Sequence, residues 1–547
     1  MAFIVKKKIK GKEYYYLRES KRIDGKVKSI CKAYLGKTLK GAKKKLKEME
    51  KEISEKKKKV VKSESVVITK ISIEELANFC KRRGFVFKSS EIYGGFSGFW
   101  DFGPLGVEMF NNIKKEWWNF FVRERENMVG IDASIISHPR TWKASGHLES
   151  FNDVFVKCKK CGKTRKLDEG EFGKVRCENC GGEYESLGKF NLLFHTQVGV
   201  IDPEIAYLRG ETAQSIFMDF KLVQQTSRMQ LPFGIAQIGR CFRNEIAPRD
   251  FLFRSREFHI GEFEFFINPE EKKCPLLKAK HLKCKFSFSD EETQLKNSEK
   301  LKEVTIESLI KKKKLGEWHA YWLAEQIFWF RSLGLEKIKI REHTKKELAF
   351  YSSATFDIDY EYPFGSKEIA GNANRGQYDL RQHEKESKSK MEVFDEKSGK
   401  KVVPRVIEPT FGMERIFLAL LTNAYCDDKK RGNIILKLPA KIAPIKVAVF
   451  PLIKRDELEK IAREIFEDLK KEFNCVYDSS GSIGRRYARN DEVGTPFCLT
   501  VDFDSIKKKD VTIRDRDSTK QIRVKIADLK NILRQLLVGE KNFSSFL

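Results

Sequence analysis

The chain has 547 residues, 41% of them hydrophobic and 12% aromatic, a composition that favours about three to four folded domains over a disordered chain. Lysine and arginine number 107 against 78 aspartate and glutamate, so the formal net charge is +29 and nucleic acid is the expected partner. No apolar run approaches the roughly 18–20 residues of a membrane span, and the N-terminus lacks a signal-peptide core. We therefore expect a cytoplasmic protein with no membrane contact.

The first 62 residues form a basic N-terminal appendix with 23 basic and 7 acidic side chains. Short strands joined by a turn are expected within residues 1–38. A Lys-rich helix is predicted from Leu39, because apolar residues recur there every three to four positions. A solvated tail and an RNA-backbone clamp both explain this segment, since lysine contacts phosphate without reading sequence.

The remainder is predicted to form two further domains. Residues 68–436 make the larger one, with insertions at 155–185 and 270–315, the second of them polar. Residues 437–547 alternate between buried strands and one amphipathic helix, which is typical of a separate α/β domain.

Four of the twelve cysteines form two CxxC pairs separated by 15 residues. Each pair is followed by glycine, which permits the tight turn that brings both sulfurs to one point. Four such thiolates fit a closed, structural Zn²⁺ site, although four reduced structural cysteines remain the alternative. The predicted ligands are Cys158, Cys161, Cys177 and Cys180.

A strand–loop–strand segment follows, from Cys241 to Glu262. Because side chains alternate along a strand, Arg243 and Glu245 are expected on one face of the first strand. The same period places Arg254, Arg256, Phe258 and Glu262 on one face of the second strand. An aromatic ring flanked by guanidinium and carboxylate groups suits a base and its phosphates, and a solvated, salt-bridged strand face is the alternative.

Two shorter motifs place further charges at helix starts. Glu408 and Thr410 end a predicted strand, Gly412 opens a turn, and Arg415 lies in the first turn of an apolar helix, where the amide dipoles favour anions. Glu211 precedes another predicted helix. Taken alone, it would be interpreted as an acidic residue that stabilises the N-terminus of that helix.

Together these strings resemble the class II aminoacyl-tRNA synthetases, and from about residue 68 onward the homodimeric glycyl-tRNA synthetases. Trp100-Asp-Phe-Gly-Pro-Leu-Gly, Leu231-Pro-Phe-Gly-Ile-Ala-Gln-Ile-Gly and Gly481-Ser-Ile-Gly-Arg-Arg-Tyr-Ala-Arg also follow that family. The resemblance implies an α+β fold: an antiparallel-sheet catalytic core with a zinc-knuckle insertion, a C-terminal α/β anticodon-binding domain and the basic appendix. It also implies a homodimer that uses tRNA(Gly), glycine and ATP with Mg²⁺, in addition to the structural Zn²⁺.

The resemblance also implies residue roles. Arg243 would grip the α-phosphate of ATP, Glu245 the adenine amino group and Arg254 the γ-phosphate, with Arg243, Glu245 and Arg415 as the catalytic set. Phe258 and Arg415 would cover the two faces of adenine. The full ATP-binding set would be Arg243, Asn244, Glu245, Phe253, Arg254, Arg256, Phe258, Glu368, Ile369, Gly412 and Arg415. The glycine-binding set would be Arg165, Glu211, Phe258, Glu262, Arg375, Glu408 and Thr410, with Arg165 and Lys166 competing for one family position.

Four residues at three sites depart from the family pattern. Gly210 stands where proline is usual, Ser366-Lys367 where Trp-Gly is usual, and Thr410 where serine is usual. Threonine keeps the hydroxyl and adds a methyl group, which should tighten a pocket that holds no side chain.

The chemistry agrees with this interpretation. Adenylate formation is in-line attack of a carboxylate on the α-phosphorus, so positioning and charge neutralisation are required and an enzyme nucleophile is not. Three other hypotheses remain: a class II synthetase for another amino acid, an inactive paralogue that binds RNA, and a zinc-ribbon nucleic-acid-binding protein. The last explains the charge and the cysteines but not the Arg/Phe/Glu strand faces.

Overall fold

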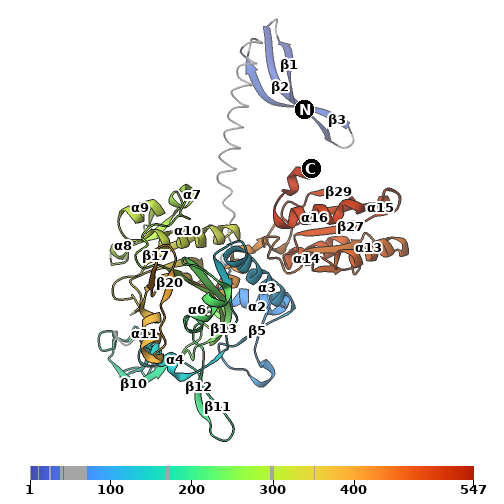
Figure 1. The fold of residues 1–547 in the computed structure, drawn as a ribbon. Coiled ribbons are helices and arrows are strands. Elements are labelled where there is room, and N and C mark those ends of the chain that lie inside the picture. Colours follow the sequence, from blue (N-terminus) through green and yellow to red (C-terminus); the bar gives the residue numbers. More distant parts are fainter. Residues whose placement is uncertain are drawn as a thin grey trace. The chain divides into compact units, whose positions relative to one another are not determined.

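The computed structural model describes residues 2–9, 12–23, 26–36, 38, 41, 71–167, 172–295, 301–349 and 351–547. The chain divides into two compact units, Met1–Thr69 and Lys70–Leu547, each with sheets of its own (Figure 1). Within the described part of the chain, no helix combines the length and the apolar character needed to cross a bilayer.

The first unit contains a three-stranded antiparallel sheet in the order β1-β2-β3. Its strands are β1 (Ala2–Ile9), β2 (Lys12–Ile23) and β3 (Lys26–Gly36). They are longer than the short strands expected within residues 1–38. The Lys-rich helix predicted from Leu39 lies, apart from Gly41, outside the described residues.

A nine-stranded sheet forms the centre of the second unit, and most of its pairings are antiparallel. The parallel pairs are β13 with β6 and β15 with β17. Across the sheet, the order is β16 (Lys302–Thr305), β15 (Lys285–Ser289), β17 (Ile338–Glu342), β18 (Ala354–Tyr362), β19 (Gly365–Gly376), β22 (Arg405–Gly412), β14 (Glu257–Ile267), β13 (Phe233–Phe242) and β6 (Met128–Gly130).

The two faces of this sheet carry different side chains, because side chains alternate along each strand. Phe263 and Phe411 lie on the face that packs against Trp117, Trp322 and Trp329. These tryptophans belong to α3 (Pro104–Trp118) and α10 (Glu317–Ser332), and α12 (Met413–Ala424) contributes to the same core. On the other face, the acidic or hydroxylic side chains of Glu262 and Glu264 on β14 and of Glu408 and Thr410 on β22 contribute to the site described below.

The described residues of the two predicted insertions include helices and strands of the second unit. The region 270–315 supplies the sheet strands β15 and β16 together with α7 (Ala279–Leu282), α8 (Glu291–Leu295) and α9 (Ile306–Lys311). The cysteine-containing segment has a three-stranded sheet of its own, in the order β10 (Tyr184–Asn191), β8 (Asn152–Cys158) and β9 (Thr164–Leu167).

The C-terminal region has the α/β architecture that the alternating sequence pattern predicts. Its five-stranded sheet runs β26 (Cys475–Tyr477), β25 (Val447–Pro451), β27 (Phe497–Val501), β28 (Asp510–Asp515) and β29 (Gln521–Lys525). A hydrophobic core joins this sheet to α13 (Asp456–Leu469) and α16 (Leu529–Val538). The region also contains α14 (Ile483–Glu492) and α15 (Phe503–Lys508).

Shorter elements complete the second unit. Its helices include α2 (Ile73–Arg83), α4 (Pro139–Ala144), α5 (His147–Ser150), α6 (Ala213–Ser227) and α11 (Tyr378–Ser387). Its further strands are β4 (Val86–Lys88), β5 (Trp100–Phe102), β7 (Ile136–Ser137), β11 (His195–Val198), β12 (Glu204–Leu208), β20 (Val393–Asp395), β21 (Lys400–Val402), β23 (Tyr425–Asp428) and β24 (Asn433–Leu436).

Candidate active site

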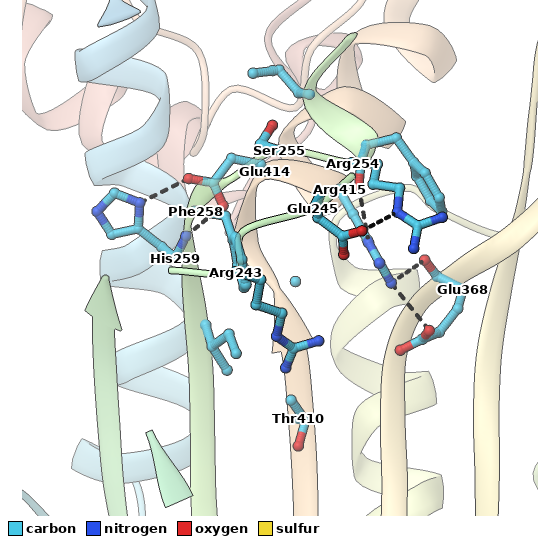
Figure 2. Close-up of a pocket in the computed structure, with 14 residues that line it drawn as sticks. Arg243, Glu245, Arg254, Ser255, Phe258, His259, Glu368, Thr410, Glu414 and Arg415 are labelled. Carbon is cyan, nitrogen blue, oxygen red and sulfur yellow. Dashed lines mark hydrogen bonds and ion pairs between the residues drawn. The ribbon is translucent and has the colours of Figure 1, made fainter. Parts of the chain in front are cut away.

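A cavity of about 130 Å³ opens where β13, β14, β22 and the start of α12 meet (Figure 2). Its lining mixes guanidinium, carboxylate and aromatic groups, as the strand–loop–strand motif predicts. The lining residues are Arg243, Glu245, Leu252, Phe253, Arg254, Ser255, Phe258, His259, Ile260, Glu368, Thr410, Gly412, Glu414 and Arg415.

Arg243 lies directly after β13, at the wall of the cavity. Its Nε donates to the carbonyl oxygen of Gly210 at 3.0 Å, and its guanidinium lies 5.4 Å from the ring centroid of Phe258. The guanidinium also lies 5.2 Å from the ring centroid of Phe151. These contacts fix the cation beside an aromatic surface, an arrangement that suits a phosphate attached to a stacked base.

Glu245 and Arg254 form an ion pair across the loop between β13 and β14. Arg254 Nε donates to Glu245 Oε2 at 2.8 Å. Arg256 points elsewhere, because its Nε donates to the Glu245 carbonyl at 3.0 Å and its Nη1 to the Ser97 carbonyl at 2.9 Å. Arg254 lines the cavity, whereas Arg256 stabilises the loop that carries Glu245.

Arg415 occupies the first turn of α12, as the sequence predicts, and lies 4.5 Å over the ring of Phe253. Its Nη1 is 3.1 Å from Glu368 Oε2, an ion pair visible in Figure 2. Burial by itself raises the pKa of Glu368, but Arg415 outweighs that effect and holds the pKa below its ordinary value. Glu368 is thus an ionised carboxylate at the edge of the cavity.

A cluster of buried carboxylates, called the carboxylate pocket below, lies on the same face of the sheet. One oxygen from each of Glu262, Glu264 and Glu408 falls within 4.8 Å of the others. Glu262 accepts hydrogen bonds from two hydroxyls, Thr212 Oγ1 at 2.5 Å and Thr410 Oγ1 at 2.8 Å. The pairing of Glu262 with Thr410 across β14 and β22 produces the second contact.

Arg375 is the cation of this pocket and is buried with it. Its Nη1 donates to Glu408 Oε1 at 2.7 Å, while Nε and Nη2 form a fork on Asp379 at 2.7 and 2.8 Å. The guanidinium also lies 3.9 Å from the ring centroid of Tyr351. One fork-shaped cation thereby orders two carboxylates from two different elements.

Glu211 completes the pocket just before α6. Its Oε2 is 3.2 Å from His147 Nε2, and its Oε1 accepts from Gln214 Nε2 at 2.9 Å. Burial alone raises the pKa of Glu211, but His147 and Arg375 outweigh it and hold that pKa below the ordinary value. By contrast, burial and the charge of Glu211 raise the pKa of Glu262. A compact cation such as a primary ammonium group fits this surplus of buried carboxylates.

The structure separates the predicted site residues into three groups. The first group lines the cavity and comprises Arg243, Glu245, Phe253, Arg254, Phe258, Glu368, Thr410, Gly412 and Arg415. The second group forms the carboxylate pocket and comprises Glu211, Glu262, Arg375 and Glu408. The third group lies in neither site. Asn244, Arg256 and Ile369 are not among the lining residues, and Ile369 is buried in the hydrophobic core. Arg165 lies on β9, where its Nη1 donates to Glu178 Oε1 at 2.5 Å.

Sequence reasoning missed several members of the pocket. Thr212, His147 and Asp379 each contact one of its charged groups. Glu264 lies two positions beyond Glu262 on the same strand, so the period of two was a signal that it shares that face.

The four cysteines of the CxxC pairs come together in one cluster. Their sulfurs all lie within 4.8 Å of one another, with Cys158 and Cys180 at 3.4 Å and Cys161 and Cys177 at 3.6 Å. Gly162 and Gly181 adopt φ values of 70° and 68°, the left-handed turn expected after each pair. Tetrahedral thiolates at a Zn–S distance of about 2.3 Å would be roughly 3.8 Å apart, so the cluster fits zinc with little adjustment.

Comparison with known proteins agrees with this geometry. Residues 446–536 match the family model of the anticodon binding domain. The chain is 42% identical over 475 residues to the glycine--tRNA ligase of Treponema denticola, covering 84% of this chain and 96% of that one. It is 43% identical over 501 residues to the glycine--tRNA ligase of Caldanaerobacter subterraneus subsp. tengcongensis, covering 86% and 99%.

A solved structure also resembles this fold. The prolyl-tRNA synthetase from Cryptosporidium parvum, complexed with halofuginone and AMPPNP, superposes with a TM-score of 0.53 at 15% sequence identity. The match covers 85% of this chain and 77% of that one, and it confirms the class II synthetase architecture predicted from the sequence.

Proposed function

The chain belongs to the glycine--tRNA ligase family, and we propose that it attaches glycine to tRNA(Gly) in two steps. In the first, the glycine carboxylate attacks the α-phosphorus of ATP, pyrophosphate leaves and glycyl-adenylate forms. In the second, a hydroxyl at the 3′ end of the tRNA attacks the adenylate carbonyl and AMP leaves.

One observation carries this proposal above all: the guanidinium-lined cavity and the carboxylate pocket share one sheet face and meet at Thr410. Thr410 lines the cavity, and its hydroxyl also donates to Glu262 in the pocket at 2.8 Å. ATP in the cavity and an amino acid held by its ammonium group in the pocket would therefore have their reacting atoms side by side. Such positioning supplies a large part of the rate enhancement in a reaction without an enzyme nucleophile.

The cavity residues would bind and neutralise ATP. Arg243, beside Phe258, would hold the α-phosphate as negative charge develops there, with Phe258 stacked on the adenine. The Nε of Arg254 donates a hydrogen bond to Glu245, which leaves its Nη groups to bind the γ-phosphate. Glu245 would accept a hydrogen bond from the adenine amino group. Arg415, which lies over the ring of Phe253, would cover the face of the base that Phe258 does not contact, together with the phosphates.

The pocket residues would select glycine. Glu211, Glu262 and Glu408 would surround its ammonium group, and Arg375 would hold Glu408 in place. The threonine methyl at position 410, where the family usually has serine, would narrow the space beside Cα. Exclusion of a larger side chain discriminates better than one methylene of favourable burial would.

ATP–pyrophosphate exchange with each amino acid in turn tests this proposal. We expect glycine to support exchange and alanine and serine to fail. Equal exchange with alanine or serine would overturn the assignment to glycine, and exchange with none would favour an inactive RNA-binding paralogue.

Two metal ions belong to the proposal. Mg²⁺ would accompany ATP and neutralise its phosphates, and the ionised carboxylate of Glu368 at the cavity edge is the hard oxygen ligand that suits it. Zn²⁺ would be structural, held by Cys158, Cys161, Cys177 and Cys180. Metal analysis should find about one zinc ion per chain, and full zinc retention by a Cys158→Ser/Cys177→Ser double variant would refute the site.

The proposed assembly is a cytoplasmic homodimer. The β11–β12 hairpin supports a subunit contact, because Val200 and Ile201 at its tip are 99% and 90% exposed and Ile205 is also exposed. Light scattering on the purified protein should give twice the chain mass. A monomer at micromolar concentration would contradict the dimer while leaving the chemistry intact.

A further inference from the structure

Glu264 is a carboxyl group that the proposed reaction does not use. It lies on β14 two positions after Glu262 and is 0% exposed. Among the residues that the structure describes, neither of its oxygens has a hydrogen-bond partner, although one oxygen lies within 4.8 Å of an oxygen of both Glu262 and Glu408.

The neighbours of Glu264 are already held by other groups. Glu262 accepts hydroxyl hydrogen bonds at both oxygens, from Thr212 and Thr410. Glu408 receives Arg375 at Oε1 only, and among the described residues its Oε2 accepts no hydrogen bond. Oε2 of Glu408 is therefore open to a further donor, and Glu264 is an adjacent group able to supply one.

Charge balance decides the form in which Glu264 is present. An ionised carboxylate with no hydrogen bond and no contact with water is among the most costly groups a protein can bury. Burial and the nearby Glu408 raise the pKa of Glu264 well above its ordinary value. The charged groups that face it are Glu262 on the same strand, Glu408 on β22, Arg375 on β19 and Asp379 on α11.

We propose that Glu264 is a neutral carboxylic acid whose hydroxyl donates to Glu408 and so positions that carboxylate at the ammonium site. Glu264 is thus a positioning residue that acts through Glu408. This inference rests on the proposed glycine site. The proposal assigns different protonation states to two carboxyl groups that lie two residues apart. Glu262 is ionised in order to bind the ammonium group, whereas Glu264 is protonated in order to donate to Glu408.

Three variants separate these roles in ATP–pyrophosphate exchange. Glu264→Gln keeps the size and a hydrogen-bond donor, so its KM for glycine should stay within about threefold of wild type. Glu264→Met removes the donor and should raise that KM about tenfold or more, with the KM for ATP unchanged. Glu262→Gln, the matched control, removes a required charge and should raise the KM for glycine over about a hundredfold.

Two results would overturn the assignment. If Glu264→Gln were as damaging as Glu262→Gln, Glu264 would be an ionised ligand. If Glu264→Met retained the wild-type KM for glycine, Glu264 would merely fill space. Wild-type protein without glycine-dependent exchange would instead refute the proposed function.

Thermal unfolding tests the protonation state without using activity, and it also serves if Glu264→Met does not fold. A carboxyl with a raised pKa in the folded state stabilises the protein at low pH, and this stabilisation is lost as the pH rises toward that pKa. The unfolding equilibrium constant of wild type relative to Glu264→Gln should therefore increase, by up to about tenfold per pH unit above pH 5. Parallel pH profiles for the two proteins would show that Glu264 is ionised and the inference wrong.

Discussion

The nucleotide cavity and the carboxylate pocket both concentrate charged side chains, but they differ in how far those charges are exposed to solvent. In the nucleotide cavity, the charges sit on partly exposed side chains, such as Arg415 at 29% and Glu368 at 43% exposure. In the carboxylate pocket they are enclosed, and Arg375 is only 1% exposed. Water and the incoming phosphates can balance an open site, whereas a closed site must be balanced by its own residues. Substitutions in the open cavity should therefore reduce rate, and those in the closed pocket should reduce stability as well.

The strongest test of this contrast is Arg375→Met. Glu408 and Asp379 would both lose their shared cation, and removing one partner of a buried ion pair costs about 3–5 kcal/mol of unfolding free energy. Chemical denaturation of both proteins, followed by fluorescence, would measure the loss.

The loss should depend on pH in a defined direction. Burial raises the pKa of Glu408 well above its ordinary value, and Arg375 opposes that rise. Without Arg375 the folded pKa is higher still, so the variant gains relative stability when protonation neutralises the carboxyl. The difference between the two proteins should shrink from pH 8 to about pH 5. A difference that does not vary with pH would show that lost packing, and not charge, explains the destabilisation.

Arg243→Ala tests the open cavity. Losing one charge contact that strengthens in the transition state costs about 3–4 kcal/mol, so glycine-dependent exchange should fall by two to three orders of magnitude. The melting temperature should hardly change, because the cavity is solvated. Arg240→Ala is the control, since Arg240 lies three residues earlier, on β13, and pairs with Glu257 outside the cavity. Equal losses in the two variants would indicate a general disturbance of β13.

Thr410→Val tests the junction of the two pockets at nearly constant volume. It removes the 2.8 Å hydrogen bond to Glu262, and a hydrogen bond to a charged group is worth about 1.5–3 kcal/mol. The KM for glycine should rise about ten- to a hundredfold, measured by exchange at saturating ATP. Thr410→Ser retains the hydroxyl and should stay near wild type. Similar values for both substitutions would show that the methyl group, not the hydroxyl, matters here.

Local sequence patterns predicted the parts of the site that depend on strand period and helix starts. Phe258 and Glu262 share a face of β14, and Arg415 lies in the first turn of α12, as expected. The same rule misled between the strands, because β13 ends at Phe242 and β14 starts at Glu257. The four predicted strand residues that lie in this loop instead are Arg243, Glu245, Arg254 and Arg256. Thr212 and Asp379 could not be found in this way, since their contacts with Glu262 and Arg375 depend on tertiary packing rather than on a repeating pattern.

The smallest expected effect lies outside both pockets. Removing residues 1–62 takes away 23 basic and 7 acidic side chains from a unit with its own sheet, so glycine-dependent exchange should be unchanged. If the lysines clamp the tRNA backbone, the KM for tRNA should rise and the salt dependence of tRNA binding should become less steep, because fewer counterions are released. Filter binding across a salt series measures both. The same affinity and salt slope in the truncated protein would identify the appendix as a solvated tail, and reduced exchange would show that it supports the pockets after all.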